Sequence, residues 1–203
     1  MLIRVLSRYL DAICVNYLRN QAAAQNIVDE LGKIGVRAIA VAADVASEDQ
    51  VNHLFKVVDS QLGRVTALVN NAGILEQQMR VERMDAARLN RIFAANITGS
   101  FLCAREAVKR MSIKKGGIGG AIVNVSSGAS RSGSPGEYVD YAASKGAVDS
   151  MTIGLAKEVA DEGIRVNAVR PGFIYTDIHA DGGEPNRVER IIDLLPMKRG
   201  GQA

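Results

Sequence analysis

The stretch AIVNVSSGASRSGSPGEYVDYAASK, residues 121–145, contains the pattern that decides the fold. It opens with a short apolar run, residues 121–125, rich in β-branched side chains, which predicts a buried strand. A loop rich in Ser, Gly and Pro follows, and an Ala-rich helix is expected to begin near Glu137. The order strand, loop and helix predicts one unit of an α/β fold.

Two residues of this expected helix, Tyr141 and Lys145, lie four positions apart and therefore share one helix face. A neighbouring ammonium favours the phenolate and lowers the pKa of a tyrosine from its usual value of about 10. Because acid–base catalysis works best near the operating pH, the pair predicts a proton-transfer site close to the serines that end the strand. The alternative is a half-buried tyrosine that only packs.

Composition predicts one α/β domain over residues 1–203. The 203 residues are 47% hydrophobic and only 4% aromatic, a mixture typical of a buried parallel sheet. The net charge of +3 is too small to argue for nucleic acid, and no apolar run reaches the about 18 residues of a membrane span. The isolated Cys14 and Cys103 predict reduced thiols in a cytoplasmic protein, without a disulfide framework or a metal site. A signal peptide is not expected at the N-terminus.

Hydrophobic patterning predicts strands and helices that alternate along the chain. Strands are expected at residues 12–16, 36–43, 65–69, 121–125 and 164–169, and helices at residues 21–34, 47–62, 85–111 and 137–162. Residues 176–203 are polar and irregular, with a helical patch near residues 186–195. The alternation predicts a doubly wound parallel sheet with helices on both faces, in three layers, α/β/α.

Polar or turn-forming residues follow the ends of several expected strands. Ligands bind at the carboxyl ends of parallel strands, so this repetition predicts a site at that edge of the sheet. The residues concerned are Asp44, Asn70, Asn71, Ser126, Ser127, Pro171 and Gly172. The glycine-rich run at residues 116–120 does not predict a phosphate loop, because it follows a helix and precedes a strand.

Together these motifs resemble those of the short-chain dehydrogenase/reductase family. They stand in the family's order: Asn70-Asn71-Ala72-Gly73, Asn96, Ser127, Tyr141-Ala142-Ala143-Ser144-Lys145 and Pro171-Gly172. The resemblance extends from about residue 12 to the end of the chain. It is nearest to bacterial glucose- or sugar-dehydrogenase-like members and is also similar to 3-oxoacyl-carrier-protein reductases. It implies a Rossmann-like fold, a homo-oligomer, and hydride transfer between a nicotinamide cofactor and a small carbonyl or alcohol substrate.

The resemblance also implies a role for each catalytic candidate. Tyr141 would exchange a proton with the substrate oxygen, and Lys145 would lower the pKa of that tyrosine and hold the nicotinamide ribose. Ser127 would form a hydrogen bond with the carbonyl oxygen. Asn96 would position a water in a proton relay behind Lys145.

A second tyrosine and a second serine compete for these roles. Tyr138 is the less favoured tyrosine, because no lysine lies four positions beyond it. Ser127 is preferred to Ser126 from its spacing to Tyr141.

Other family positions concern the cofactor. The resemblance assigns Asp44 and Val45 to adenine, Asn70, Ala72 and Gly73 to the adenosine ribose, and Pro171, Gly172, Ile174 and Thr176 to the nicotinamide carboxamide, with Tyr141 and Lys145 beside the nicotinamide ribose. After the first expected strand, Asn16-Tyr17-Leu18-Arg19 stands where an NAD enzyme usually carries an acidic residue. A nearby arginine suits a 2′-phosphate, so NADP is favoured over NAD. The alternative for Arg19 is a solvated surface charge.

Two segments of the family's pattern are missing from the sequence. The family begins with a strand and the turn TGxxxGxG, whereas residues 1–11 contain no glycine, and it usually continues beyond a segment like residues 196–203. We therefore expect a sheet that lacks its central strand and is incomplete at both ends. Residues 2–6 are a candidate replacement strand, although their connection to residue 12 is too short for a crossover helix. The alternative to an oxidoreductase is an inactive fragment that acts at most as an oligomerisation module through its long helices.

Overall fold

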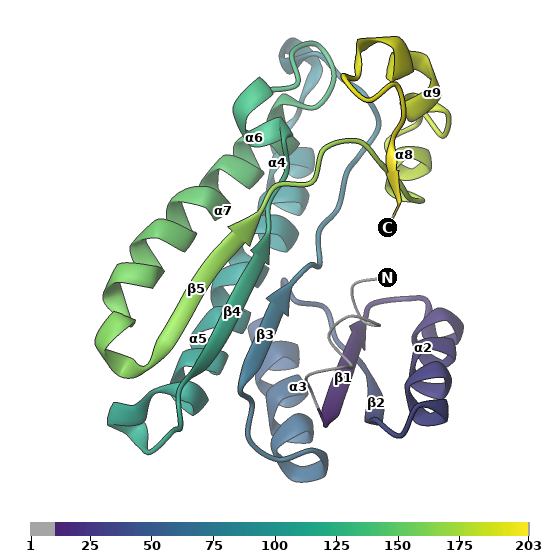
Figure 1. Cartoon of the computed structure of the whole chain (residues 1–203). Helices are drawn as coiled ribbons and strands as arrows, with labels where there is room; N and C mark the ends of the chain where they lie inside the picture. The colour runs from purple at the N-terminus through teal and green to yellow at the C-terminus, as the bar shows by residue number, and fades with distance from the viewer. Residues whose placement is uncertain (1–10, 203) are drawn as a thin grey trace.

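A computed structural model describes residues 11–202, which form an α/β fold with parallel strands (Figure 1). The strands are β1 (Ala12–Tyr17), β2 (Arg37–Ala42), β3 (Ala67–Asn70), β4 (Gly120–Val125), β5 (Ile164–Val169), β6 (Ile174–Tyr175) and β7 (Gly201–Gln202). The helices are α2 (Gln21–Lys33), α3 (Glu48–Gln61), α4 (Ala86–Phe93), α5 (Gly99–Met111), α6 (Ala129–Ser132), α7 (Val139–Glu158), α8 (Ile178–Asp181) and α9 (Arg187–Ile191). The predicted alternation is confirmed, and the strand considered at residues 2–6 lies outside the described residues.

The strands form three parallel sheets with a break between β1 and β3. β1 pairs with β2, whereas β3, β4 and β5 form a second sheet in that order, and β6 pairs with β7. Within residues 11–202 no hydrogen-bonded pairing joins β1 to β3. The break agrees with the expectation of a sheet that lacks its central strand.

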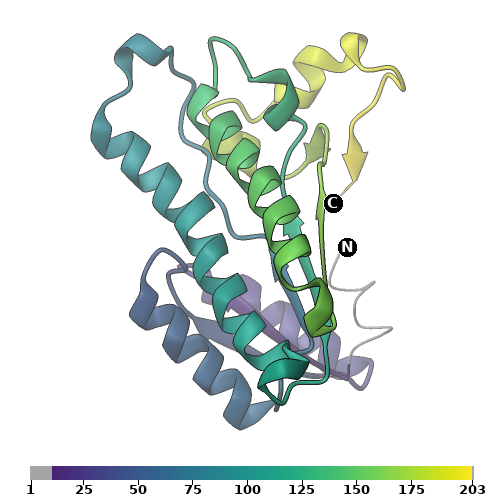
Figure 2. The ribbon, with the colours of Figure 1, turned by 90° about the vertical axis from the view of Figure 1, so that its left-hand side faces the viewer.

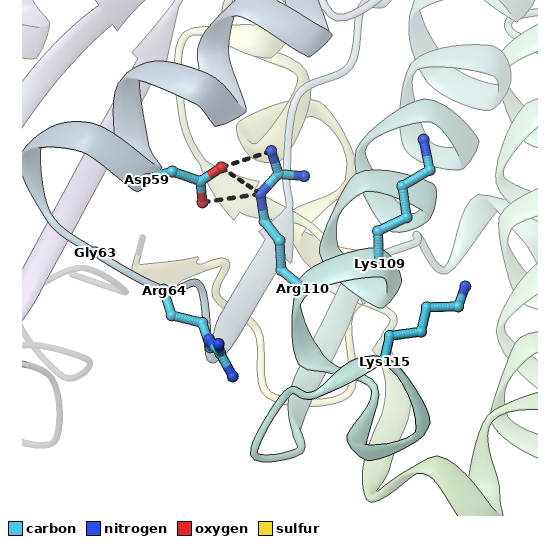
Figure 3. A pocket seen from close by; sticks show the side chains of 6 residues that line it. All are labelled: Asp59, Gly63, Arg64, Lys109, Arg110 and Lys115. Carbon is cyan, nitrogen blue, oxygen red and sulfur yellow. Dashed lines mark hydrogen bonds and ion pairs between the residues drawn. The ribbon is translucent and has the colours of Figure 1, made fainter.

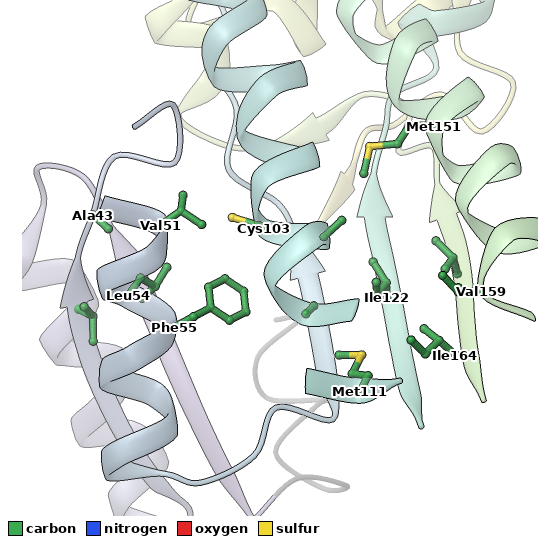
Figure 4. Close-up of a cluster of buried hydrophobic side chains, with 14 residues drawn as sticks. Ala43, Val51, Leu54, Phe55, Cys103, Met111, Ile122, Met151, Val159 and Ile164 are labelled. Carbon is green, nitrogen blue, oxygen red and sulfur yellow. The ribbon is translucent and has the colours of Figure 1, made fainter. Parts of the chain in front are cut away.

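One hydrophobic core nevertheless joins the two larger sheets (Figure 4). Val41 of β2 and Ile122 of β4 belong to the same buried cluster, although their strands lie in different sheets. Figure 4 shows the Phe55 ring reaching from α3 toward α5, whose Met111 is fully buried. Side-chain packing through α3 and α5 therefore connects the sheets where backbone hydrogen bonds do not.

Helices cover both faces of the β1–β2 sheet. Ile39 and Val41 point into the core beneath α3, and α2 packs on the same two strands from the other side. The face of the β3–β4–β5 sheet beside the core is covered by the helix α4–α5 and by α7, drawn in teal and green in Figure 2. The predicted α/β/α layering is therefore complete at the β1–β2 sheet, whereas α4, α5 and α7 cover one face of the β3–β4–β5 sheet (Figure 1).

The helix expected over residues 85–111 forms with one interruption. Asp85 begins it, because its carboxylate accepts the backbone N–H of Arg88 at 2.7 Å. A π-helical turn, Ala94–Thr98, then separates α4 from α5 and contains the fully buried Asn96. Such turns often occur at functional sites.

The start of α7 lies two residues later than predicted, at Val139. Gly136 has a φ of +74°, so the chain turns there and enters the helix only after Tyr138. The segment after β5 folds back over this end of α7 as α8 and α9 (Figure 1). None of the helices within residues 11–202 is long and apolar enough to cross a membrane.

Candidate active site

Helix α7 brings Tyr141 and Lys145 together at the carboxyl end of β4. The Lys145 ammonium donates a hydrogen bond to the carbonyl of Val125, the last residue of β4, at 2.7 Å. Its nitrogen lies 5.6 Å from the centre of the Tyr141 ring. Lys145 is only 5% exposed, so its charge is held inside the protein. The two side chains therefore lie side by side, as their spacing predicts.

Burial dominates the proton affinities of this pair. Burial raises the pKa of the Tyr141 phenol above its ordinary value, and a hydrogen bond with Ser127 opposes that rise. Burial lowers the pKa of the Lys145 ammonium to about 8, and the Asp149 carboxylate opposes that fall. The direction of the Tyr141 pKa differs from the sequence expectation, because burial of the phenol outweighs the hydrogen bond with Ser127. The phenol is therefore protonated at neutral pH, which suits a proton donor.

The two candidate serines have different surroundings. Ser126 is buried, and its hydroxyl donates to the backbone carbonyl of Lys145 at 3.2 Å. Ser127 is partly exposed, and its side chain interacts with the Tyr141 phenol. Ser127 is therefore the hydroxyl on the Tyr141 side, and Ser126 fastens the strand end to α7.

The competing tyrosine is used elsewhere. The Tyr138 hydroxyl donates to the carbonyl of Gly182 at 2.9 Å, which ties the end of α8 to the start of α7. The guanidinium of Arg187 stacks on the Tyr138 ring, with its central carbon 4.6 Å from the ring centre. Tyr138 is thus buried under the α8–α9 segment, and Tyr141 is the tyrosine beside Lys145.

Asn96 fastens the chain after β3 to α7. Its side-chain amide accepts the N–H of Ile74 at 2.7 Å and donates to the Ile74 carbonyl and to the Ser144 hydroxyl, both at 3.0 Å. A Cβ added at Gly73 would lie 3.2 Å from the Asn96 oxygen and 3.4 Å from the Lys145 nitrogen. Gly73, Asn96 and Lys145 therefore meet at one point, and a larger residue at position 73 would crowd them.

Three of the residues assigned to the adenosine half also converge. Val45, Asn70 and Ala72 line a small cavity of about 10 Å³, together with Gly99, Ser100 and Cys103. The Asn70 amide donates to the Asn124 oxygen at 2.9 Å and to the Ser100 carbonyl at 3.2 Å, so it already has partners within the protein. Asp44 lies just before this cavity, where its carboxylate accepts the N–H of Ala46 at 2.9 Å.

The remaining cofactor candidates lie at the same sheet edge, but some are held by hydrogen bonds within the protein and others are exposed. The Asn16 amide donates to the carbonyls of Val41 and Ala43 at 3.1 and 3.0 Å, so it fastens β1 to β2. Arg19 is exposed after β1. The residues assigned to the carboxamide follow β5. The Pro171 carbonyl accepts the N–H of Gly128 at 2.9 Å, and Ile174 lies in β6. Gly172 and Thr176 are exposed.

These residues suit the two ends of a dinucleotide better than its middle. Gly73 allows close approach beside Lys145, and Val45 and Ala72 lie together at the position that the resemblance assigns to the adenosine half. Within the described part of the chain, no glycine-rich turn between a strand and a helix offers backbone N–H groups to the pyrophosphate. No group of three potential metal ligands occurs among the described residues either.

Comparison with known proteins decides the family. The family model described as short chain dehydrogenase matches residues 6–186. The chain belongs to the short-chain dehydrogenase family. It is 58% identical over 191 residues to the uncharacterized oxidoreductase YgfF of Escherichia coli (strain K12), covering 94% of this chain and 77% of the relative. It is 38% identical over 190 residues to a 3-oxoacyl-[acyl-carrier-protein] reductase of Synechocystis sp., covering 94% of this chain and 73% of the relative.

Solved structures support the Rossmann-like fold of this short-chain dehydrogenase. A short chain dehydrogenase from Burkholderia cenocepacia J2315, crystallised in complex with NADP, superimposes with a TM-score of 0.87 at 25% identity. The match covers 98% of this chain and 78% of that protein. The similarity therefore extends over both larger sheets of this chain.

Sequence reasoning missed several partners of the site. Ser144, which binds Asn96, lies inside the quoted motif and could have been singled out from its place on the helix. The buried ion pair between Arg88 and Asp140 has no local signal, because its members are separated by 52 residues. The ion pair between Arg170 and Asp149, at 2.8 Å, could not be predicted from the sequence either.

A larger cavity, of about 360 Å³, lies away from the candidate site (Figure 3). It is lined by Asp59, Gly63, Arg64, Lys109, Arg110 and Lys115, near the amino ends of β3 and β4. Asp59 pairs with Arg110 at 2.7 Å, and Lys109 pairs with Glu106 at 2.7 Å. Figure 3 shows Lys109 and Lys115 pointing in the same direction, away from Arg64. Asp59 and Arg110 therefore form an ion pair between α3 and α5, and Lys109 pairs within α5. Arg64 donates to the Gly116 carbonyl, so the side chains do not converge on one point.

Proposed function

We propose that this short-chain dehydrogenase uses NADPH to reduce a carbonyl group to an alcohol, with Tyr141 as the proton donor. The observation that carries the proposal is the buried pair of Tyr141 and Lys145 at the end of β4, with the pKa of the phenol held above its ordinary value. A protonated phenol is the form required when a carbonyl oxygen gains a proton.

Each residue has a defined part in the proposed reaction. The Ser127 hydroxyl donates a hydrogen bond to the substrate oxygen, and the Tyr141 hydroxyl donates its proton to that oxygen. The Lys145 ammonium then stabilises the phenolate that remains. Asn96 holds the segment after Gly73 against α7. In the proposed reaction it also positions the water of the proton relay behind Lys145. The nicotinamide supplies the hydride when it is bound.

The choice of NADP over NAD rests on two observations. Arg19 is exposed after β1 and no acidic residue follows that strand before α2, which suits a 2′-phosphate. A similar short chain dehydrogenase was crystallised with NADP. Reduction, rather than oxidation, is favoured by the similarity to 3-oxoacyl-[acyl-carrier-protein] reductases.

The proposal includes a cytoplasmic homo-oligomer. Phe101 on α5 and Ile153 on α7 are 51% and 58% exposed, which favours burial of these long helices against another copy. Burial raises the pKa of the Cys14 and Cys103 thiols to about 11, so both favour the reduced, unreactive state of a cytoplasmic protein.

One observation favours the alternative, an inactive fragment. The break between β1 and β3 lies at the sheet edge where the cofactor would cross from adenine to nicotinamide. An enzyme with this break must hold the pyrophosphate without a glycine-rich turn from the described residues. The two functions therefore differ in whether the chain binds NADPH.

Fluorescence titration of the purified chain with NADPH and NADH tests the proposal, followed by turnover of acetoacetyl-coenzyme A as a probe. We expect saturable binding that prefers NADPH. Tyr141→Phe is expected to lower kcat at least about a hundredfold and to leave NADPH binding within about twofold, because only the proton donor is lost. Tyr138→Phe is the matched control and should keep most of the turnover. Absence of binding by a chain that is folded by circular dichroism would support the fragment instead.

A further inference from the structure

The buried face of α7 has a polar residue directly before each residue of the catalytic pair. Asp140 precedes Tyr141, and Ser144 precedes Lys145. Both side chains point into the contact between α7 and the helix α4–α5, where Ser144 meets Asn96 and Asp140 meets Arg88. Figure 2 shows these two helical segments side by side, and residue contacts between α4 and α7 agree.

The pair of Arg88 and Asp140 is closed off from water. The Arg88 Nε donates to Asp140 Oδ2 at 2.6 Å, and the two side chains are 5% and 0% exposed. The other carboxylate oxygen accepts the backbone N–H of Tyr141 at 2.8 Å. One carboxylate thus connects α4 to the amide of the catalytic tyrosine itself.

Arg88 also holds the segment that leads away from Gly73. Its Nη1 donates to the carbonyl of Gln77 at 2.8 Å, and two residues later the N–H of Met79 donates to the Glu137 carbonyl at 2.9 Å. Asn96 holds the beginning of the same segment at Ile74. The segment, α4 and the first turn of α7 therefore meet at the Arg88 guanidinium.

This arrangement is a poor way to gain stability. Removing two charges from water costs free energy that their attraction only partly returns, and a well-packed apolar pair often does as well or better. Within the described residues, the Nη2 of Arg88 is buried without any hydrogen-bond partner, which adds to the cost. An apolar contact would allow α7 to rotate or slide against α4, whereas the directed hydrogen bonds of an ion pair fix one orientation of α7.

We propose that Arg88 and Asp140 are positioning residues that fix the rotation of the first turns of α7, and thereby the direction in which Tyr141 and Lys145 point. This inference rests on the proposed function for its catalytic consequence, but its structural part does not depend on turnover. Ser144 and Asn96 form the second fixed point, one helical turn further along α7.

The test replaces the ion pair by an apolar pair of similar size, Arg88→Met with Asp140→Leu. The matched control is Lys114→Met with Asp161→Leu, because that pair has the same 2.6 Å separation but is exposed and remote from α7's first turn. Hydrogen exchange of the α7 amides is measured in both variants, and kcat and KM are measured with acetoacetyl-coenzyme A and NADPH.

We expect the amides of residues 141–145 to exchange at least about tenfold faster in the apolar variant, while those of residues 151–158 stay within about twofold. kcat should fall at least about tenfold and KM for NADPH should stay within about threefold, because misdirection of the proton donor affects the chemical step. The control should change neither quantity. Unchanged exchange at residues 141–145, or equal acceleration along the whole of α7, would overturn the inference.

Two provisions keep the test decisive. Asp140→Asn keeps the volume and the acceptor for the Tyr141 N–H, so it provides the same readout if the apolar variant does not fold, with a smaller change expected at the same amides. If the unaltered chain shows no turnover, the proposed function fails while the exchange measurement still decides the positioning role.

Discussion

At the scale of single residues, the candidate site depends on the positive charge of Lys145, which burial of its side chain disfavours. Burial lowers the pKa of Lys145 to about 8, and the Asp149 carboxylate is the group that raises it again. Burial also raises the pKa of Asp149, but the hydrogen bond from Arg170 at 2.8 Å, the largest opposing influence, helps to keep that pKa below its ordinary value. Asp149 therefore stays ionised and supports the Lys145 ammonium that the proposed reaction needs.

Replacing this carboxylate should change the pH dependence of the reaction. In the proposed reaction, activity should fall as the pH rises through the pKa of Lys145, because the ammonium is lost. Asp149→Asn removes a group that raises this pKa, so the alkaline limb of the kcat profile should move to lower pH, and turnover at pH ~9 should fall about threefold to tenfold. The measurement is kcat against pH at saturating NADPH. Asp161→Asn, which changes an exposed carboxylate, is the control, and an unmoved alkaline limb would contradict the role of Asp149.

The sequence was a good guide to these residues only where their relation is local. Tyr141 and Lys145 share one helix, so their spacing alone predicts that they lie side by side. The direction of the Tyr141 pKa was predicted wrongly, because desolvation depends on what covers the ring, and α7's neighbours come from distant segments. Arg88 and Asp140 could not be paired from the sequence for the same reason.

At the scale of elements, helix identity could be predicted and helix detail could not. The apolar periodicity of residues 85–111 predicts one helix, but it does not distinguish an α-helical turn from the π-helical turn Ala94–Thr98. That turn depends on the hydrogen bonds of Asn96 with Ile74, which is 22 residues away in the sequence. The start of α7 was displaced because Gly136 has a positive φ, which patterning does not reveal.

Helix α5 contains an ion-pair network that should govern stability in acid. Burial, the largest influence, raises the pKa of Glu106, but hydrogen bonds from Lys109, Arg110 and Arg105 outweigh it and lower the value to about 2. The ion pairs measure 2.7 Å to Lys109 and 2.9 Å to Arg110. Because the folded-state pKa is depressed, the stabilisation is complete above the ordinary value of 4.5 and is lost as the pH falls toward 2.

Glu106→Gln should therefore lower the free energy of unfolding at pH ~7 by about 1–3 kcal/mol. The difference from the unaltered chain should shrink as the pH falls from 4.5 toward 2, because the unfolded state then binds a proton at Glu106 more readily than the folded state does, and near pH 2 the folded state loses the charge as well. Urea denaturation at several pH values measures it, and Glu48→Gln, at an exposed carboxylate that also pairs with Arg105, is the control. Equal free energies of unfolding for Glu106→Gln and the unaltered chain at neutral pH would contradict a stabilising role of the Glu106 ion pairs.

At the scale of the whole molecule, the sequence predicted the alternation of strands and helices, and no pairing joins β1 to β3 within residues 11–202. The alternation of strands and helices is sufficient for the layers, because parallel strands require crossover helices. What patterning could not predict is how the halves stay together. That depends on α3 and α5, whose side chains fill one core with residues from both sheets, such as Val41 and Ile122.

The break between β1 and β3 should divide the molecule into parts of unequal stability. Among residues 11–202, β1 is hydrogen-bonded to β2 and not to β3, so opening this pair leaves the β3–β4–β5 sheet intact and costs mainly the side-chain contacts with α3. In native-state hydrogen exchange, we expect the amides of β2 to exchange at least about tenfold faster than those of β4, which has a paired strand on each side. The β5 amides serve as an internal comparison, because β5 is also an edge strand but packs directly under α7. Equal protection of β2 and β4 would mean that the shared core alone makes the two sheets unfold as one unit. Faster exchange in β2 would instead mean that the adenosine side of the site opens while Tyr141 and Lys145 remain in position.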